Sequence, residues 1–179
     1  MKKIIFITLI STLMFSCKEK TNQNNNFSDF LNTIPELQLP FTANSYVDLQ
    51  TKVQIDTTFK KYNDIYANGI YGKIKINDSI HAIIYLLAGD NVFPKIVTYN
   101  KQGAKIAEQI LVNLPGGSDG YNGNGSSFLT LSKDLEIQIV DTTNSFDRDS
   151  SDVIIEKSRT TEITIEKYNI KSNGQILLK

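Results

Sequence analysis

The chain has few of the side chains that most often carry enzyme chemistry. It contains one cysteine, one histidine and no tryptophan among 179 residues. A single cysteine forms no disulfide within the chain, so we expect stability to come from a packed core. The histidine, His81, lies in an apolar, strand-like run, and the sequence places no nucleophile or orienting carboxylate beside it, so we expect a structural role. Because metal sites usually need several His or Cys ligands, we expect no metal and no cofactor.

The charged residues show no excess or block of one sign. The chain carries 19 basic and 19 acidic side chains, which gives a formal net charge of zero. A protein that binds nucleic acid usually gathers its Lys and Arg side chains into a basic patch. We therefore expect no nucleic-acid partner.

An apolar run opens the chain, but it is too short to cross a bilayer. It extends from Ile4 to Phe15 after Met1-Lys2-Lys3, whereas a spanning helix needs about 20 apolar residues. A basic start, a short apolar stretch and a small residue before a cleavage site are typical of a secretory signal peptide. Here the small residue is Ser16, and the one cysteine, Cys17, follows it directly.

The segment Met14-Phe15-Ser16-Cys17 resembles the cleavage motif of bacterial lipoproteins, which is an aliphatic residue, two small residues and a cysteine. The resemblance covers about the first twenty residues and departs from the pattern at the bulky Phe15. It implies that residues 1–16 are a signal peptide and that acyl chains such as palmitate are attached to Cys17. An ordinary secretory signal and an uncleaved anchor are the alternatives.

The residues after Cys17 bear on which membrane holds the anchor. In the lipoproteins that the motif resembles, an aspartate at the second position of the mature chain usually retains the protein in the inner membrane. Lys18-Glu19-Lys20 lacks that aspartate. The resemblance therefore implies an anchor in the outer membrane, and both its periplasmic face and the cell surface remain open.

The chain then divides into a tether and one folded domain. Residues 17–26 are polar apart from Cys17 and offer nothing to bury, so they do not offset the entropy of ordering and form a flexible tether. A coil of this length reaches roughly 15–20 Å. Residues 27–179 have the length of a single domain.

Within that domain we expect one short helix followed by strands. Ser28 is a candidate cap for a helix that carries Phe30, Leu31 and Ile34 on one face. Alternating and β-branched runs separated by turn residues predict the strands. The predicted strands are Val47–Ile55, Ile70–Ile76, Ser79–Leu87, Val92–Thr98, Lys105–Val112, Ser127–Leu131, Leu135–Val140, Val153–Lys157, Thr161–Lys171 and Gln175–Leu178.

The pattern predicts an all-β fold, an antiparallel meander of about nine to eleven strands. A barrel-like closure, a curved sheet and a two-sheet sandwich all satisfy it. Two segments, Tyr99-Asn100 followed by Gly103 and Tyr168-Asn169 followed by Gly174, resemble the hairpin repeats of β-propellers. A propeller needs at least four blades of about 40 residues, so the chain has barely enough length for one.

A glycine-rich stretch is the most unusual feature of the domain. Residues 115–125 contain five glycines, and long loops between strands are often functional. We expect a plain connection between strands here; a partner or ligand loop carried by Asp119, Tyr121, Asn122 and Asn124 is the alternative. The stretch lacks the Gly-Lys-Ser/Thr ending of a phosphate-binding loop.

Two further patterns are weaker. Asp141, Asp147, Asp149 and Asp152 crowd one predicted loop, but their spacing departs from that of a calcium loop, so we expect a solvated acidic turn. Short Asp-Ser/Thr motifs resemble the O-glycosylation sites of some Gram-negative bacteria. Their acceptors are Thr57, Ser79 and Thr142.

These features favour a non-enzymatic function. We expect an outer-membrane lipoprotein that acts as a binding or accessory module, held by the lipid on Cys17, with a protein or glycan as its partner. The alternative is an envelope glycan or peptidoglycan hydrolase with paired carboxylates. No spacing in the sequence points to one such pair, and the lack of tryptophan disfavours a sugar-binding cleft. A plain structural spacer is a third possibility.

Overall fold

The computed structural model describes residues 26–44, 49–54, 56–87, 93–112 and 123–179. The predicted signal peptide, Cys17 and the predicted tether up to residue 25 lie outside the described residues. The elements are α1 (Phe27–Asn32), β1 (Phe41–Asn44), β2 (Val53–Gln54), the 3-10 helix η1 (Thr57–Phe59), β3 (Ala67–Lys75), β4 (Ile80–Leu87), β5 (Phe93–Asn100), β6 (Lys105–Ile110), β7 (Gly123–Leu131), β8 (Glu136–Arg148), β9 (Ile154–Ile170) and β10 (Ile176–Leu178).

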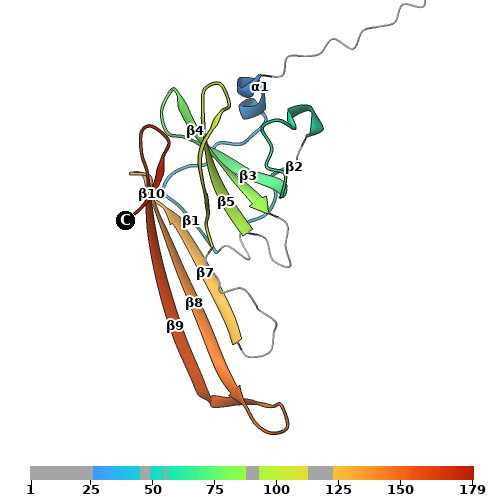
Figure 1. The fold of residues 1–179 in the computed structure, drawn as a ribbon, viewed down its shortest axis with the longest axis vertical. Coiled ribbons are helices and arrows are strands. Elements are labelled where there is room, and N and C mark those ends of the chain that lie inside the picture. The colour runs from blue at the N-terminus through green and yellow to red at the C-terminus, as the bar shows by residue number, and fades with distance from the viewer. Residues whose placement is uncertain (1–25, 45–48, 55, 88–92, 113–122) are drawn as a thin grey trace, which may run out of the picture.

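The described strands form two antiparallel five-stranded sheets (Figure 1). Sheet 1 has the order β1-β7-β8-β9-β10, and sheet 2 has the order β2-β3-β4-β5-β6. Hydrophobic side chains from both sheets pack into one core cluster. The all-β prediction is confirmed, and of the architectures left open the two-sheet sandwich is the one observed, rather than a closed barrel or a propeller.

The meander is confirmed within each sheet, because β2 to β6 and β7 to β10 each follow in chain order. The exception is β1, which the sequence analysis missed. It pairs with β7, and Phe41 lies opposite Leu131. A four-residue strand whose partner lies far along the chain has no alternating pattern long enough to reveal it.

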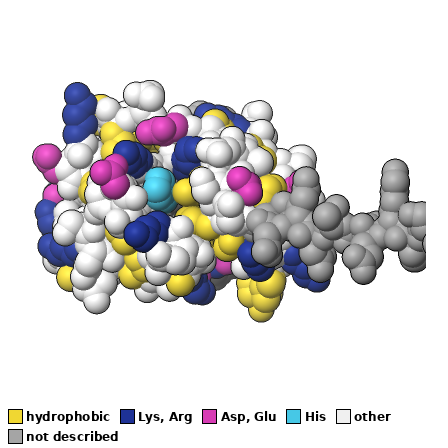
Figure 2. Space-filling model, turned by 90° about the horizontal axis from the view of Figure 1, so that it is seen from above, with side chains coloured by type: hydrophobic (Ala, Val, Ile, Leu, Met, Phe, Trp, Pro, Cys, Tyr) yellow, Lys and Arg dark blue, Asp and Glu magenta, His cyan; other side chains and the backbone are white. Residues whose placement is uncertain are grey.

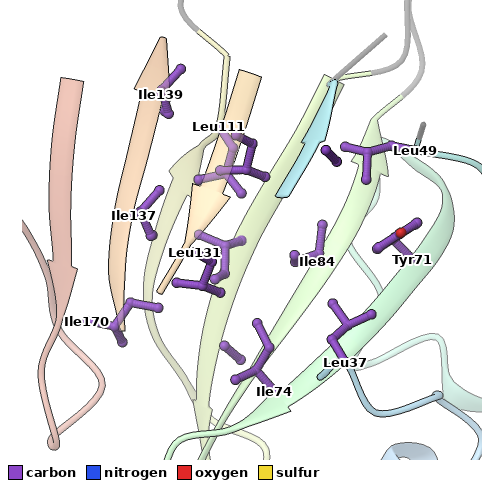
Figure 3. Close-up of a cluster of buried hydrophobic side chains, with 14 of the residues drawn as sticks. Leu37, Leu49, Tyr71, Ile74, Ile84, Leu111, Leu131, Ile137, Ile139 and Ile170 are labelled. Carbon is purple, nitrogen blue, oxygen red and sulfur yellow. The ribbon is translucent and has the colours of Figure 1, made fainter. Parts of the chain in front are cut away.

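The core between the sheets follows the alternation of the strands (Figure 3). In β4, Ile84 and Leu86 point into this core, whereas Ile83 and Tyr85 join a second cluster on the other side of sheet 2. Both faces of β4 are therefore buried, which explains why its sequence is a nearly continuous apolar run. The side chain of Thr98 in β5 donates a 2.6 Å hydrogen bond to the carbonyl of Gly174, and so ties sheet 2 to the turn before β10.

The second cluster is covered by what we name the cover layer, α1 together with residues 56–66. The ring centroids of Phe27 and Phe30 in α1 lie 5.0 and 5.5 Å from the ring centroid of Tyr62. The helix is confirmed, but its N-cap is Asn26 rather than Ser28. The Asn26 side chain accepts a 2.9 Å hydrogen bond from the backbone N–H of Asp29, and Asp29 accepts one in return, a capping box that satisfies two donors at the helix start.

Three strand predictions need correction. In the described part of the predicted strand Val47–Ile55, residues 49–54, only Val53–Gln54 forms a strand. The segments Val153–Lys157 and Thr161–Lys171 are not separate strands, because the single strand β9 runs through both of them. Likewise β8 continues past Val140 to Arg148. In both strands the threonine-rich stretches continue the ladder, since β-branched residues fit a pleated strand even where they are polar.

As a result β8 and β9 form a hairpin much longer than the sandwich. Their register runs without a break from Glu136–Asn169 to Ser145–Thr160, then shifts before Asp147–Ile155. In Figure 1 this long hairpin extends to the end of the molecule opposite α1. At 3.4 Å per residue, the 13 residues of β8 span roughly 40 Å.

Candidate binding site on the long hairpin

Of the four residues predicted to carry the glycine-rich loop, the structure describes only Asn124. Asp119, Tyr121 and Asn122 lie outside the described residues. Asn124 is not in a loop, because β7 begins at Gly123 and Asn124 pairs with Asn144 of β8. The predicted loop is therefore shorter than residues 115–125, and the prediction that it binds a partner stays a prediction.

The acidic residues do not gather in one loop as predicted. Asp141 and Asp147 are in β8, and Asp149 and Asp152 are in the turn that follows it. Within the described part of the chain, no three His, Cys, Asp or Glu side chains are placed to hold a metal ion. The interpretation of a loop was wrong because Thr142 and Thr143 continue the strand.

The Asp-Ser/Thr motifs lie at three different places. Thr57 is exposed in η1, Ser79 is exposed between β3 and β4, and Thr142 is half-buried in β8. Modification at these three residues stays a prediction.

His81 is half-buried at one end of β4. Figure 2 shows the histidine among lysine and acidic side chains. Burial lowers the pKa of His81, and the nearby charges of Lys73 and Lys75 lower it further. The imidazole is therefore mainly neutral at pH 7.

The most distinctive feature of the long hairpin is an open backbone edge on β9. The described strand β10 pairs only with Tyr168–Ile170. Lys179 N–H donates to the carbonyl of Lys167 on this side of β9. Because backbone groups alternate along an antiparallel strand, the N–H and C=O groups of Thr161, Ile163 and Ile165 point to the same side. We name these residues the open edge, since among the described strands only β8 pairs with them, on their other side.

Beside the open edge, an apolar row crosses three strands. Phe128 of β7 lies opposite Val140 of β8, which lies opposite Ile165 of β9. These side chains point away from sheet 2, because their neighbours Leu129 and Ile139 point into the core. Phe128 is 45% exposed and Ile165 is 56% exposed. Ile163, on the same face, is 61% exposed and lies opposite Thr142.

The outer end of the site is held by polar contacts. Asn144 of β8 accepts hydrogen bonds on its side-chain oxygen from Arg159, at 3.0 and 2.7 Å, and from the Thr161 hydroxyl at 2.8 Å. These bonds lie on the same face as Ile163, since Asn144 pairs directly with Thr161. The apolar row thus ends in a polar, positively charged border.

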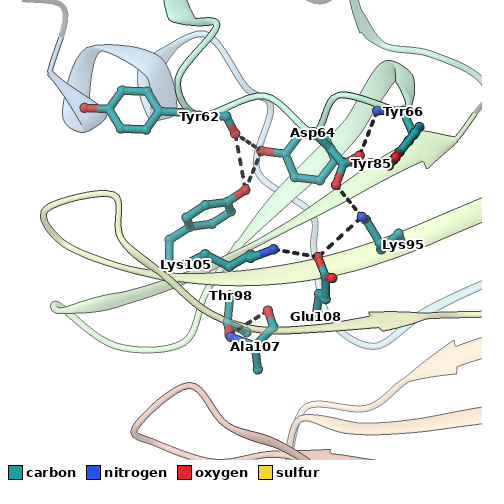
Figure 4. Close-up of polar contacts among 10 residues, drawn as sticks. Tyr62, Asp64, Tyr66, Tyr85, Lys95, Thr98, Lys105, Ala107 and Glu108 are labelled. Carbon is teal, nitrogen blue, oxygen red and sulfur yellow. Dashed lines mark hydrogen bonds and ion pairs between the residues drawn. The ribbon is translucent and has the colours of Figure 1, made fainter.

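The other polar cluster lies under the cover layer (Figure 4). The ammonium of Lys95 contacts Asp64 and lies 3.4 Å from a carboxylate oxygen of Glu108. The hydroxyls of Tyr85 and Tyr99 both donate to the carbonyl of Tyr62, at 2.7 and 3.2 Å. Burial raises the pKa of both phenols, that of Tyr99 to about 12, so neither is a nucleophile near neutral pH.

The carboxylates of this cluster are ion-pair partners rather than proton donors. Burial raises the pKa of Asp64, but the hydrogen bond and charge of Lys95 outweigh burial and leave the pKa below its usual value. The hydrogen bond from Lys105 lowers the pKa of Glu108, and the charge of Lys95 adds to this. A hydrolase with paired carboxylates needs one carboxyl with a raised pKa. We interpret the cluster as structural.

No protein-family model, curated protein or solved structure matches this chain. None of the described helices has the length and apolar character needed to cross a membrane.

Sequence reasoning missed the open edge and the apolar row. The alternation of Thr161, Ile163 and Ile165 was visible and predicted a strand. It did not show that one face and one edge of that strand stay uncovered, because this depends on where sheet 2 and β10 end.

Proposed function

We propose that this protein is a non-enzymatic binding module of the cell envelope, anchored in the outer membrane by acyl chains on Cys17. Its long hairpin receives an extended segment of a partner protein. The open edge of β9, bordered by exposed isoleucines, is the observation that carries the proposal.

The chemistry of the edge favours an extended polypeptide. Thr161, Ile163 and Ile165 each offer one N–H and one C=O in the geometry that a further antiparallel strand needs. Each such hydrogen bond contributes about 0.5–1.5 kcal/mol net. The exposed side chains of Ile163 and Ile165 select β-branched or aromatic residues at alternate positions of the partner.

The position of the hairpin suits a tethered protein. The tether joins the domain at Asn26, directly before α1, and the long hairpin extends to the opposite end (Figure 1). An anchor near α1 therefore leaves the hairpin accessible. Long exposed edges attract unwanted strands as well, so we expect the partner to cover this edge for much of the time.

The proposal is tested by capturing the partner from cells with the anchored protein, after mild crosslinking. The test variant is Ile163→Pro, because proline removes an N–H that faces the open edge and leaves the ladder to β8 intact. Its control is Ile163→Thr, which keeps the N–H and a β-branched side chain. We expect one stoichiometric partner with the wild type and the threonine variant, and its loss with the proline variant.

Thermal unfolding of the three proteins checks that the hairpin is folded, and Thr161→Pro repeats the test at the neighbouring edge position. Equal recovery of the partner with both proline variants contradicts strand addition. Turnover of peptidoglycan or glycan by the purified protein, without any partner, contradicts the non-enzymatic assignment.

A further inference from the structure

The cover layer presents two large apolar side chains to solvent. Ile65 is 84% exposed and Tyr66 is 69% exposed. They are adjacent in the chain, between the buried Tyr62 and the start of β3 at Ala67. Two neighbouring exposed side chains of this size begin an apolar patch, and exposed apolar patches mark interaction sites when they are extended.

The pair is held in place rather than carried on a loose loop. The carboxylate of Asp64 is bound by the buried Lys95 of β5 (Figure 4). The same carboxylate accepts a 3.0 Å hydrogen bond from the N–H of Tyr66, and the carbonyl of Asp64 accepts one from Ala67 at 3.2 Å. Little backbone entropy therefore remains to be lost when Ile65 and Tyr66 bind a partner surface, which favours binding.

The pair also lies close to the point where the tether enters the domain. The ring centroid of Tyr62 lies 5.0 Å from the ring centroid of Phe27, the first residue of α1. Ile65 follows Tyr62 by three residues, a span of at most about 10 Å. Residues 18–26 separate Cys17 from α1, and the flexible tether expected from their composition would reach roughly 15–20 Å. A lipid on Cys17 therefore places Ile65 and Tyr66 within reach of the membrane surface.

The exposed charges of the segment that carries the pair suit a lipid headgroup. Lys60 and Lys61 are exposed in the same segment, and the Lys61 ammonium lies 4.7 Å from the centre of the Tyr62 ring. The exposed carboxylate of the segment, Asp56, accepts a 2.7 Å hydrogen bond from the backbone N–H of Thr58. Apolar and aromatic side chains next to lysines are the residues that settle at a membrane interface.

We propose that Ile65 and Tyr66 insert into the interfacial layer of the bilayer that holds the acylated Cys17. This rests on the proposed lipid anchor and adds a second contact to it. The tether raises the local concentration of the membrane at the pair, so a weak contact suffices. The phenol of Tyr66 keeps its hydroxyl among the headgroups while its ring is buried. With two contacts, the domain keeps one orientation on the membrane instead of turning freely on the tether.

The absence of tryptophan allows a direct test. The variant Tyr66→Trp introduces a single reporter at the pair, and Ile154→Trp introduces one at the far end of the long hairpin as a matched control. Both are purified in the lipidated form and reconstituted into vesicles of phosphatidylethanolamine and phosphatidylglycerol, with or without brominated acyl chains. Thermal unfolding checks both folds, and Ile65→Trp serves as a second reporter at the pair.

We expect brominated lipid to quench about half or more of the emission of the Tyr66→Trp variant, with a shift to shorter wavelength, and to leave the control unchanged. If both variants float with the vesicles and neither is quenched, the second contact is wrong while the anchor stands. Equal quenching of both also overturns the inference. If the native protein carries no lipid and does not float, the anchor itself fails.

Discussion

At the scale of single residues, Lys95 is a charged side chain held in a buried position. Its ammonium is buried in the cover-layer cluster between Asp64 and Glu108. A buried charge costs several kcal/mol unless it is paired. The pairing thus fixes the segment that carries Ile65 and Tyr66. Sequence alone gave no sign of this cluster, because its members come from three segments that only the fold brings together.

We predict that Asp64→Asn lowers the free energy of unfolding by about 2 kcal/mol at pH 7, because it leaves a buried cation with one carboxylate instead of two. The pKa of Asp64 is lowered in the fold, so its contribution is present above the unfolded value of 3.8 and is lost as the pH falls through the folded pKa. The difference between wild type and variant therefore shrinks at pH 3. Urea denaturation at both pH values measures it.

Asp78→Asn is the control for this measurement. Asp78 pairs with Lys75 at 2.7 Å, but both side chains are exposed, and such pairs contribute little. A loss at Asp64 no larger than the loss at Asp78 contradicts the structural role of the Lys95 cluster.

At the scale of elements, the turns were predictable where they depend on a glycine that adopts the left-handed backbone conformation. The segment Asn100-Lys101-Gln102-Gly103 predicted a hairpin with a left-handed glycine, and Gly103 has a φ of 81°. Gly174, between β9 and β10, has a φ of 88°. The two turns differ in their surroundings, since Gly103 lies under the rings of the cover layer.

We predict that Gly103→Ala destabilises the protein more than Gly174→Ala. Both substitutions force a side chain into the left-handed region, at a cost of about 1–2 kcal/mol. A Cβ at position 103 would also lie 2.8 Å from the ring of Phe27, whereas one at position 174 would meet the flexible end of Ile106 at 2.7 Å. The clash with a rigid ring adds about 1–3 kcal/mol. Thermal unfolding of the two variants ranks them, and equal losses would contradict the packing of α1 on this turn.

The strand boundaries were less predictable, for a physical reason. The segment Ser158-Arg159-Thr160 lies between two predicted strands, Val153–Lys157 and Thr161–Lys171. In the structure it lies inside β9, where the register shifts opposite Ser145–Asp147. A strand exposed on both faces has no hydrophobic alternation, so the sequence pattern predicts neither its continuity nor its bulge.

At the scale of the whole molecule, the two ends differ in packing. The strands β3 to β5 are buried between the core and the cover layer. The outer part of the long hairpin, beyond Ser145 and Thr160, is two strands paired with each other. Function is proposed for the open edge of β9, which lies next to this outer part, and for the exposed pair of the cover layer, and both lie outside the core.

We predict a matching gradient in amide hydrogen exchange. Amides of Ile83 and Ile84 in β4 exchange only through global unfolding, because both faces of that strand are buried. Amides of residues 147–155 exchange by local opening, many-fold faster. Exchange followed by mass spectrometry on the intact protein measures both. Similar protection in both regions contradicts an independently opening hairpin end, and added partner should slow exchange at residues 161–165.

The sequence by itself determined the class of the fold, most of the strands, the short helix and the glycine turns, because these depend on local alternation, capping and backbone conformation. It also predicts the lipid anchor from the residues around Cys17. Only the tertiary structure decided that the strands form two sheets rather than one closed barrel, that β1 joins β7, and that Asp64 meets Lys95. It also decided that the edge at Ile163 and the pair at Ile65 stay uncovered, since exposure depends on where distant segments end, and no local pattern records that.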